Sequence, residues 1–157
     1  MASKFLFLLM CAIAVEKSTA LVLDTKDCGS VLGKFSNFDL NCNEGSTAEL
    51  CKISPGKKYT GTLKLTPNTV INNGTIILHA IFGKTTLPFP FPDNDLCKDH
   101  NIHCPLKADT EVTVSLTLAV PSFAPQVNLV AKIEFQSNVN GKVKDLACIE
   151  FLGSIHS

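Results

Sequence analysis

Two cysteines and two histidines lie close together in the stretch "CKDHNIHC", which runs from Cys97 to Cys104. Thiolate sulfur and imidazole nitrogen are zinc ligands, so Cys97, His100, His103 and Cys104 could be drawn as a zinc site. A cysteine beside a histidine can also act as a nucleophile, but that chemistry needs a free thiol. Both kinds of site depend on whether these cysteines are free or joined in a disulfide.

The N-terminus indicates the redox compartment. Lys4 precedes an apolar run over residues 5–15, and small residues follow at Ser18 and Ala20. This order predicts a secretory signal peptide over residues 1–20, with cleavage after Ala20. Eleven apolar residues are too few to cross a bilayer as a helix. We therefore expect a single soluble domain over residues 21–157 that is secreted and extracellular, with the lysosomal lumen as a second destination.

The cysteine count fits an oxidising compartment. The chain has seven cysteines, and Cys11 leaves with the predicted signal peptide. An even number in a secreted chain predicts three disulfides, although six cysteines allow fifteen pairings. The spacing only hints at the choice, since two pairs would close short loops and one pair lies near the mature termini. The six are Cys28, Cys42, Cys51, Cys97, Cys104 and Cys148.

These cysteines decide the chemistry of the Cys/His cluster. A disulfide between Cys97 and Cys104, flanked by two solvated histidines, is favoured over zinc. The adjacency of His103 and Cys104 also makes tetrahedral closure awkward. No thiol is left over for a nucleophile, and the chain has no G-x-S-x-G or H-E-x-x-H motif. We therefore expect no metal, no cofactor and no enzyme activity.

The charge of the mature chain argues against nucleic acid as a partner. Removing Lys4, Lys17 and Glu16 leaves twelve lysines and thirteen acidic residues, and the sequence contains no arginine. Arginine makes most of the bidentate contacts to phosphate and guanine. A nearly neutral chain without it is a poor binder of nucleic acid.

The hydrophobic pattern has a period of two, which predicts strands. In "TEVTVSLTLAV" the apolar residues Val112, Val114, Leu116, Leu118 and Val120 share one face. The stretches "VNLVAKIEF" and "KYTGTLKL" alternate in the same way, and "VLGKFSNFDL" and "DLACIEFLGSI" are weaker strands. The stretch "TIILHAIFG" is apolar on both faces and predicts a central strand. Its His79 has two readings, as a hydrogen-bonded histidine or as a pH sensor.

Turn residues separate these strands. Asn73-Gly74 and Asn140-Gly141 predict hairpin turns. Asn73-Gly74-Thr75 is also an acceptor sequence for N-glycosylation. Because no stretch supports an amphipathic helix, the sequence predicts an all-β protein. Its expected fold is an immunoglobulin-like antiparallel β-sandwich of about seven strands.

The stretch "LPFPFP", residues 87–92, places two phenylalanines among three prolines. Proline has no amide hydrogen, so this segment is a stiff edge or loop. Phe89 and Phe91 either fill the end of the core or line the mouth of an apolar cavity. A second proline–aromatic cluster, "VPSFAP", adds Phe123 and Pro125 and favours the cavity.

These motifs together resemble the ML (lipid-recognition) family, and within it the Niemann-Pick type C-two sterol-transfer proteins. The resemblance rests on "DCGS" at 27–30, the pair Cys42 and Cys51, His79 followed by "LPFPFP", and the pair Cys97 and Cys104-Pro105. It continues through Ala124-Pro125 to Cys148. It covers nearly all of residues 26–152 and points to an arthropod paralogue.

The resemblance implies two sheets that part to hold one lipid, and the disulfides Cys28–Cys148, Cys42–Cys51 and Cys97–Cys104. It places Phe89, Val120 and Ala124 at the cavity entrance, and Leu118, Val127, Leu129 and Ile149 on its deeper wall. The implied function is carriage of a sterol or similar lipid by a monomer that contacts membranes or a receptor only transiently.

Two departures from the family pattern leave other ligands open. Ala124 stands where well-known sterol carriers have a bulky aromatic residue, and Ile149 stands where they often have tryptophan. Smaller walls imply a wider or differently shaped cavity. The alternatives are a carrier of fatty acids or semiochemicals, and a lipid-sensing immune adaptor for a receptor, which would need an exposed apolar patch.

Overall fold

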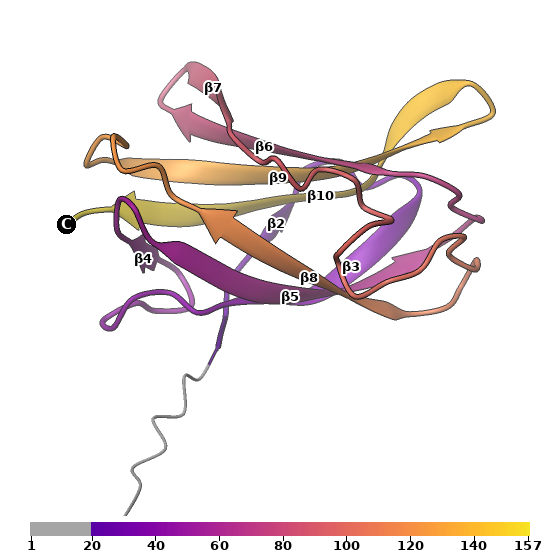
Figure 1. Cartoon of the computed structure of the whole chain (residues 1–157), viewed down its shortest axis with the longest axis horizontal. Helices are drawn as coiled ribbons and strands as arrows, with labels where there is room; N and C mark the ends of the chain where they lie inside the picture. The colour runs from indigo at the N-terminus through magenta and orange to yellow at the C-terminus, as the bar shows by residue number, and fades with distance from the viewer. Residues whose placement is uncertain (1–19) are drawn as a thin grey trace, which may run out of the picture.

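The computed structural model describes residues 20–157, and the signal peptide predicted for residues 1–20 therefore lies outside the described residues except for Ala20. The described chain forms two layers of strands packed face to face (Figure 1). Seven strands have five or more residues, and three have two or three. In chain order they are β1 (Leu21–Val22), β2 (Lys26–Asp27), β3 (Gly33–Leu40), β4 (Cys51–Ile53), β5 (Lys58–Pro67), β6 (Thr75–Phe82), β7 (Thr85–Phe89), β8 (Val112–Ala119), β9 (Asn128–Val139) and β10 (Lys142–Ile155).

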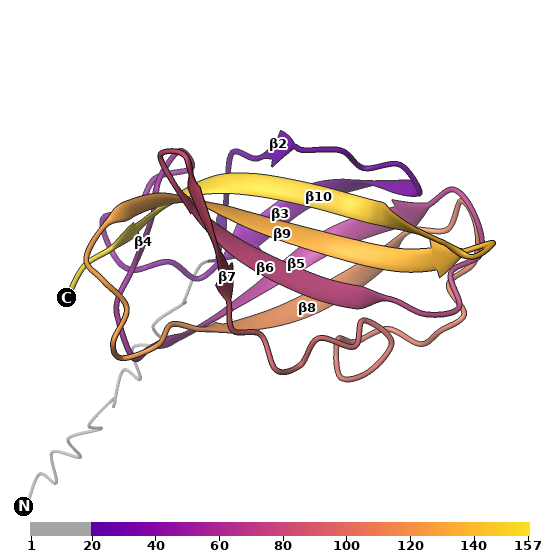
Figure 2. The same ribbon diagram turned by 90° about the horizontal axis from the view of Figure 1, so that it is seen from above.

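The strands form two sheets. One sheet has the order β1-β3-β5-β8, and the other has the order β2-β10-β9-β6-β7, with β4 added beside β10. Apart from the short parallel pair of β4 and β10, all strand pairs are antiparallel. The predicted all-β sandwich is confirmed. Strands β7 and β8 are the edge strands of their sheets, and Figure 2 shows the chain between them following one side of the sandwich.

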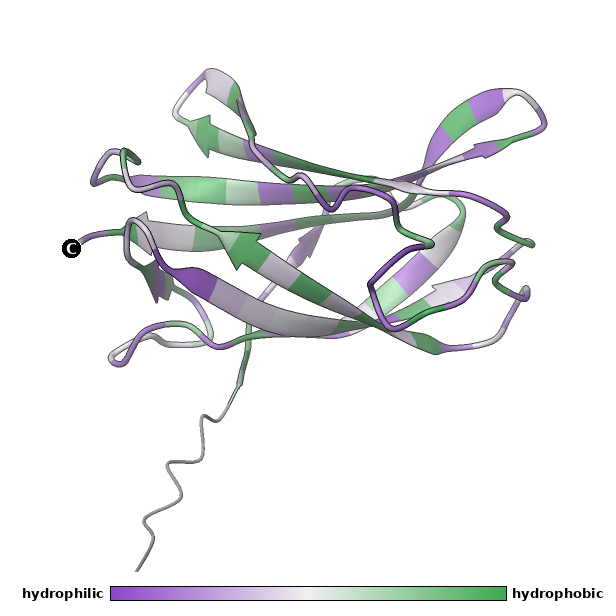
Figure 3. Ribbon diagram, viewed as in Figure 1, coloured by the Kyte–Doolittle hydropathy of each residue, from purple (hydrophilic) through white to green (hydrophobic). Residues whose placement is uncertain are grey.

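The core lies between the sheets, where the period-two pattern predicted it. On β8, Val114, Leu116 and Leu118 are buried, and on β9 Ile133 and Phe135 are buried. The residues between them are partly or fully exposed on the outer faces of the sheets, and Figure 3 shows the resulting alternation of hydrophobic and hydrophilic bands along the strands. Alternation of this kind is what a sheet with one wet face requires.

Only one of the two predicted asparagine–glycine hairpins exists. Asn140 and Gly141 have φ angles of 54° and 76° and join β9 to β10. Two consecutive residues with positive φ are typical of the tight hairpin turn that matches strand twist. The prediction for Asn73-Gly74 is wrong, because β5 and β6 belong to different sheets and this segment crosses between them. Gly74 is needed there for space, since a Cβ would lie 2.6 Å from Leu96 Cδ2.

Three disulfides form in the pairing that the family resemblance implies. Cys28–Cys148 joins residues 120 apart in sequence, with a Cα–Cα distance of 5.0 Å. Cys42–Cys51 and Cys97–Cys104 close loops of sequence separation 9 and 7. Among residues 20–157 no helix has the length and apolar character that crossing a bilayer would require.

Replacing Gly61 with alanine should lower the free energy of unfolding by about 2 kcal/mol, the usual range for overpacking. Gly61 is buried on β5, and a Cβ there would collide with the backbone oxygen of Asp39 on β3. Urea denaturation measures the change. Gly153→Ala is the matched control, because its Cβ would approach no atom closer than 3.5 Å. Equal stability of both variants would contradict the close approach of β3 and β5.

Candidate functional site

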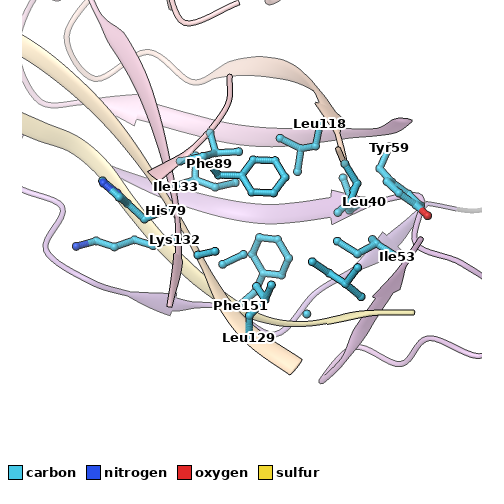
Figure 4. A pocket seen from close by; sticks show the side chains of 16 residues that line it. Leu40, Ile53, Tyr59, His79, Phe89, Leu118, Leu129, Lys132, Ile133 and Phe151 are labelled. Atoms are coloured by element: carbon cyan, nitrogen blue, oxygen red, sulfur yellow. The ribbon is translucent and has the colours of Figure 1, made fainter. Parts of the chain in front are cut away.

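An apolar cavity lies between the two sheets. Its wall comes from both sheets and from the segments that join them, as Figure 4 shows. The lining residues are Leu40, Ile53, Tyr59, Leu78, His79, Ala80, Phe89, Leu118, Val120, Leu129, Ala131, Lys132, Ile133, Phe151, Gly153 and Ile155.

Small side chains on one sheet create the void. Ala80 on β6 lies directly opposite Ala131 on β9, and Ala131 lies opposite Phe151 on β10. Gly153 follows two residues after Phe151, so its inward position carries no side chain. Elsewhere in the sandwich such positions hold leucine, isoleucine or phenylalanine and fill the space. The cavity therefore results from a local lack of side-chain volume.

The cavity presents carbon to its contents. Its one hydroxyl, that of Tyr59, donates to Asn43 Oδ1 at 2.9 Å and accepts from the Ser54 amide at 2.7 Å. His79 and Lys132 line the cavity near their backbones, and Figure 4 shows their nitrogen atoms pointing away from it. Because no free polar group faces inward, the interior can bind the apolar part of a ligand but cannot recognise a polar head group.

The cavity reaches the side of the sandwich where the two edge strands face each other. Phe89 comes from the end of β7, and Leu118 and Val120 come from the end of β8. Figure 4 shows the rings of Phe89 and Phe151 inside the cavity. Pro88, the residue before Phe89, pairs with His79 on the edge of the sheet, where its missing amide hydrogen removes no bond from the sheet interior.

The residues proposed from sequence as the lipid site fall into two groups. Phe89, Leu118, Val120 and Leu129 line the cavity. The other six lie outside its lining. Phe91 stacks on His100, and Ile149 is fully buried on β10, two residues before Phe151. Phe123 is 84% exposed and Pro125 is also exposed. Ala124 and Val127 are partly buried against the core.

Several lining residues were missed by the sequence reasoning. Ala80, Ala131 and Gly153 form the void, and Phe151 and Leu40 face it from β10 and β3. The signal in the sequence was a small residue at an inward position on each of three strands, where the other inward positions hold large apolar residues. Its meaning depends on strand register, because a small residue leaves a void only when its neighbours are also small.

His79 belongs to a polar cluster on the outer face of the larger sheet. Its Nδ1 lies 3.8 Å from Glu134 Oε1, which also pairs with Lys132 Nζ at 3.0 Å. Gln136 donates to the other Glu134 oxygen at 2.9 Å. His79 Nδ1 makes no hydrogen bond within the described part of the chain. Within residues 20–157, the groups around His79 do not indicate a ligand for this side chain.

Asp145→Asn should stabilise the protein at pH 7 by a few tenths of a kcal/mol, a small effect because the carboxylate is only partly buried and is still screened by solvent. Burial and the nearby Glu134 raise the pKa of Asp145 above its ordinary value of 3.8. The folded state therefore disfavours the charged form, and the cost is present at pH 7 and disappears below about pH 4. Thermal unfolding of wild type and variant at pH 3.5 and 7 measures it. The exposed Asp24→Asn is the control, and an equal gain at both pH values would contradict the cause.

The Cys/His cluster is a disulfide with two different histidines. Cys97 and Cys104 are bonded, and no group of histidine, cysteine or carboxylate side chains suited to a metal occurs in residues 20–157. His103 is exposed, as expected of a solvated histidine. The same expectation is wrong for His100, which is only 3% exposed because its ring is hydrogen-bonded to the backbone of two other segments.

Comparison with known proteins adds to this geometry. The family described as "ML domain" matches residues 22–155. The chain is 30% identical over 136 residues to "NPC intracellular cholesterol transporter 2" of Mus musculus, with 87% of each chain covered. It is 28% identical to "NPC intracellular cholesterol transporter 2 homolog a" of Drosophila melanogaster, covering 93% of this chain and 99% of the relative. The crystal structure of a Niemann-Pick type C2 protein from Japanese carpenter ant superposes with a TM-score of 0.75 at 27% identity, covering 85% of this chain and all of that one.

Proposed function

The chain belongs to the ML-domain family, and we propose that it carries one sterol or a similar lipid in the cavity between its sheets and transfers it to a membrane or a partner protein. Proteins of this family are lipid-binding carriers and need no cofactor, so the chain is not an enzyme. The observation that supports the cavity as the lipid site is its lining, which is apolar on every side and reaches the edge of the sandwich.

The physical gain from carriage is hydrophobic. A sterol-sized ligand would bury several hundred Å² of apolar surface, which corresponds to a gross gain of about 10 kcal/mol at about 25 cal/mol per Å². The cost of association and of ordering the ligand reduces this value. Since the interior offers no free polar group, the ligand would enter with its hydrocarbon part first and keep its polar group near Phe89 and Val120.

The closed cavity must expand to accept such a ligand. Its volume is about 50 Å³, which is room for a few water molecules. Sites for drug-sized ligands are about 300–1,000 Å³. Strands β7 and β8 are edge strands of different sheets and do not pair with each other, so the sheets can separate there without breaking strand pairing. We propose that entry moves Phe89 and Phe151 outward along this side.

The small closed volume supports a second ligand class. A fatty acid, or a semiochemical of similarly slender shape, would need less separation of the sheets than a fused-ring sterol. Leucine, isoleucine and phenylalanine side chains surround Ala80 and Ala131 and leave a cavity of only about 50 Å³. Carriage of a slender chain is therefore the alternative that the geometry favours among those suggested by the sequence.

The remaining proposals concern secretion, oligomeric state, glycosylation and a receptor partner. Secretion rests on the predicted signal peptide, and action as a monomer rests on the family resemblance. Asn73 is exposed, so its side chain is accessible to N-glycosylation, although its Oδ1 accepts a bond from the Asn138 amide at 3.3 Å. A receptor adaptor would need an exposed apolar patch, and Phe123 in the loop between β8 and β9 is 84% exposed.

The proposal is tested by lipid transfer between vesicles. Donor vesicles carry the fluorescent sterol dehydroergosterol or a fluorescent fatty acid, and acceptor vesicles carry a quencher. The protein, added in amounts far below that of the lipid, should accelerate transfer of one of these lipids in proportion to protein concentration. If a folded protein accelerates neither, the carrier proposal fails, and a stable complex with a receptor ectodomain would then support the adaptor function.

A further inference from the structure

The outer face of the larger sheet carries a row of apolar side chains. Val130 on β9 lies directly opposite both Ile81 on β6 and Leu152 on β10. Leu152 is 52% exposed, and the other two are partly buried. Neighbouring strands are about 4.8 Å apart, so the row spans about 10 Å across three strands. The next outward row is polar, with Glu150 opposite Lys132. An apolar row on a face that is otherwise wet is typical of a surface that another molecule covers.

The row forms the floor of a groove. Two open hollows lie side by side over it and share Val130 and Leu152. The first hollow is also lined by Leu50 and by Gly83 of the hairpin between β6 and β7, which rises from the sheet in Figure 1. The second hollow is bounded by residues 24–26. We call the two hollows together the outer groove. Because it has raised walls, the side chains of a partner can enter it.

The charged side chains of the outer groove are mostly acidic. Asp24, Glu49 and Glu150 line it, together with one lysine, Lys26, which leaves an excess of two acidic side chains. Within residues 20–157 none of these four forms an ion pair, although Lys26 and Glu150 are partners in the strand register. Lys132, opposite Glu150 on β9, is already paired with a carboxylate of its own strand at 3.0 Å. The carboxylates of the groove are therefore available to a cationic partner.

Apolar floor and acidic rim together favour one kind of occupant. An anionic membrane surface would meet side chains of its own sign. A second copy of this chain, packed about a two-fold axis, would bring the same carboxylates of both copies together. An extended segment that alternates apolar residues with lysine or arginine fits better. Its apolar side chains would cover Val130 and Leu152, and its cations would approach the unpaired carboxylates.

We propose that the outer groove docks a basic, apolar segment of a partner protein, with Leu152 as the main apolar contact. The interface is small and suits a transient complex, because the groove offers far less area than the standard interface of about 1,600 Å². Ile81, Val130 and Leu152 do not line the cavity between the sheets. Docking can therefore occur whether the cavity is empty or filled, and the proposal does not rest on the carrier function.

The charge preference is tested with synthetic peptides. The probe is a short fluorescent peptide in which lysine and leucine alternate, and its matched control has glutamate in place of each lysine. Fluorescence anisotropy should show that the wild type binds the lysine peptide about 10-fold or more tightly than the glutamate peptide. Binding should weaken at higher ionic strength, because salt screens exposed charges. Absence of binding of the lysine peptide, or equal binding of the two peptides, would overturn the proposal.

The place of docking is tested with variants. Leu152→Ser should weaken binding of the lysine peptide about 10-fold, as expected when a main contact is removed. Val143→Ser is the matched control and should bind as the wild type does, since Val143 is 63% exposed on the same strand and outside the groove. Thermal unfolding establishes that both variants are folded. Equal affinity of the two variants would overturn the proposal. A dimer that Leu152→Ser dissociates in sedimentation velocity would also overturn it, because a second copy would then occupy the groove.

Discussion

Ala131→Leu should lower the affinity for lipid by about 10- to 100-fold, the range that corresponds to the usual cost of overpacking a filled site. Ala131 faces the cavity between Ala80 and Phe151, so added carbons would occupy the space that the ligand needs. The empty protein should remain folded, because the side chain enters a void that is already present. Titration with dehydroergosterol and with a fluorescent fatty acid measures the loss.

The matched control for this variant is Ala119→Leu. Ala119 is exposed on β8, one residue from Leu118. Its replacement by leucine therefore adds the same atoms outside the cavity. It should bind lipid as the wild type does. Circular dichroism and thermal unfolding establish that both variants are folded. Equal affinity in Ala131→Leu and Ala119→Leu would show that lipid does not occupy this cavity.

Replacing both Cys28 and Cys148 with serine should lower the free energy of unfolding by about 5 kcal/mol in the chain-entropy description of a disulfide. The bond closes almost the whole described chain, since the two cysteines lie 120 residues apart. It also joins the segment after β2 to the middle of β10, where the Cys28 amide donates to the Cys148 oxygen at 3.0 Å. A loss of this size is a large part of the stability of an ordinary domain.

The Cys42→Ser and Cys51→Ser double variant provides the comparison. Its loop has a sequence separation of 9, for which the same description gives a loss of about 3 kcal/mol. Urea denaturation of the two double variants should therefore rank the long-loop variant as the less stable. The reverse order would mean that the long disulfide does not act mainly on the unfolded chain.

Much of the fold could be predicted because its determinants are local. The alternation of Val114, Leu116 and Leu118 identifies a half-buried strand from eleven consecutive residues. Asn140-Gly141 identifies a hairpin because the turn needs only its own two residues. Asn73-Gly74 carries the same local signal, but the chain crosses to the other sheet there, and sheet membership is a non-local property.

The site could be predicted only in part, because it depends on register. Leu118 and Leu129 were assigned to the cavity and line it, whereas Ile149 has the same inward pattern and packs outside it. The pairing of Ala80 with Ala131 decides where the void lies. These two residues are far apart in the sequence, so a local pattern cannot reveal that they are neighbours. His100 was expected in solvent for a similar reason, since its partner Ser115 lies fifteen residues away on β8.

The central claim is that one lipid molecule occupies the cavity, and native mass spectrometry tests it most directly. The protein is secreted from eukaryotic cells and measured before and after exposure to cholesterol, ergosterol, fatty acids and hydrocarbons, together with Ala131→Leu. The wild type should form a one-to-one adduct whose mass identifies a sterol or a slender chain, and the adduct should be weakened in the variant. A folded wild type with three disulfides and no adduct, or an adduct equally abundant in Ala131→Leu, would contradict the claim.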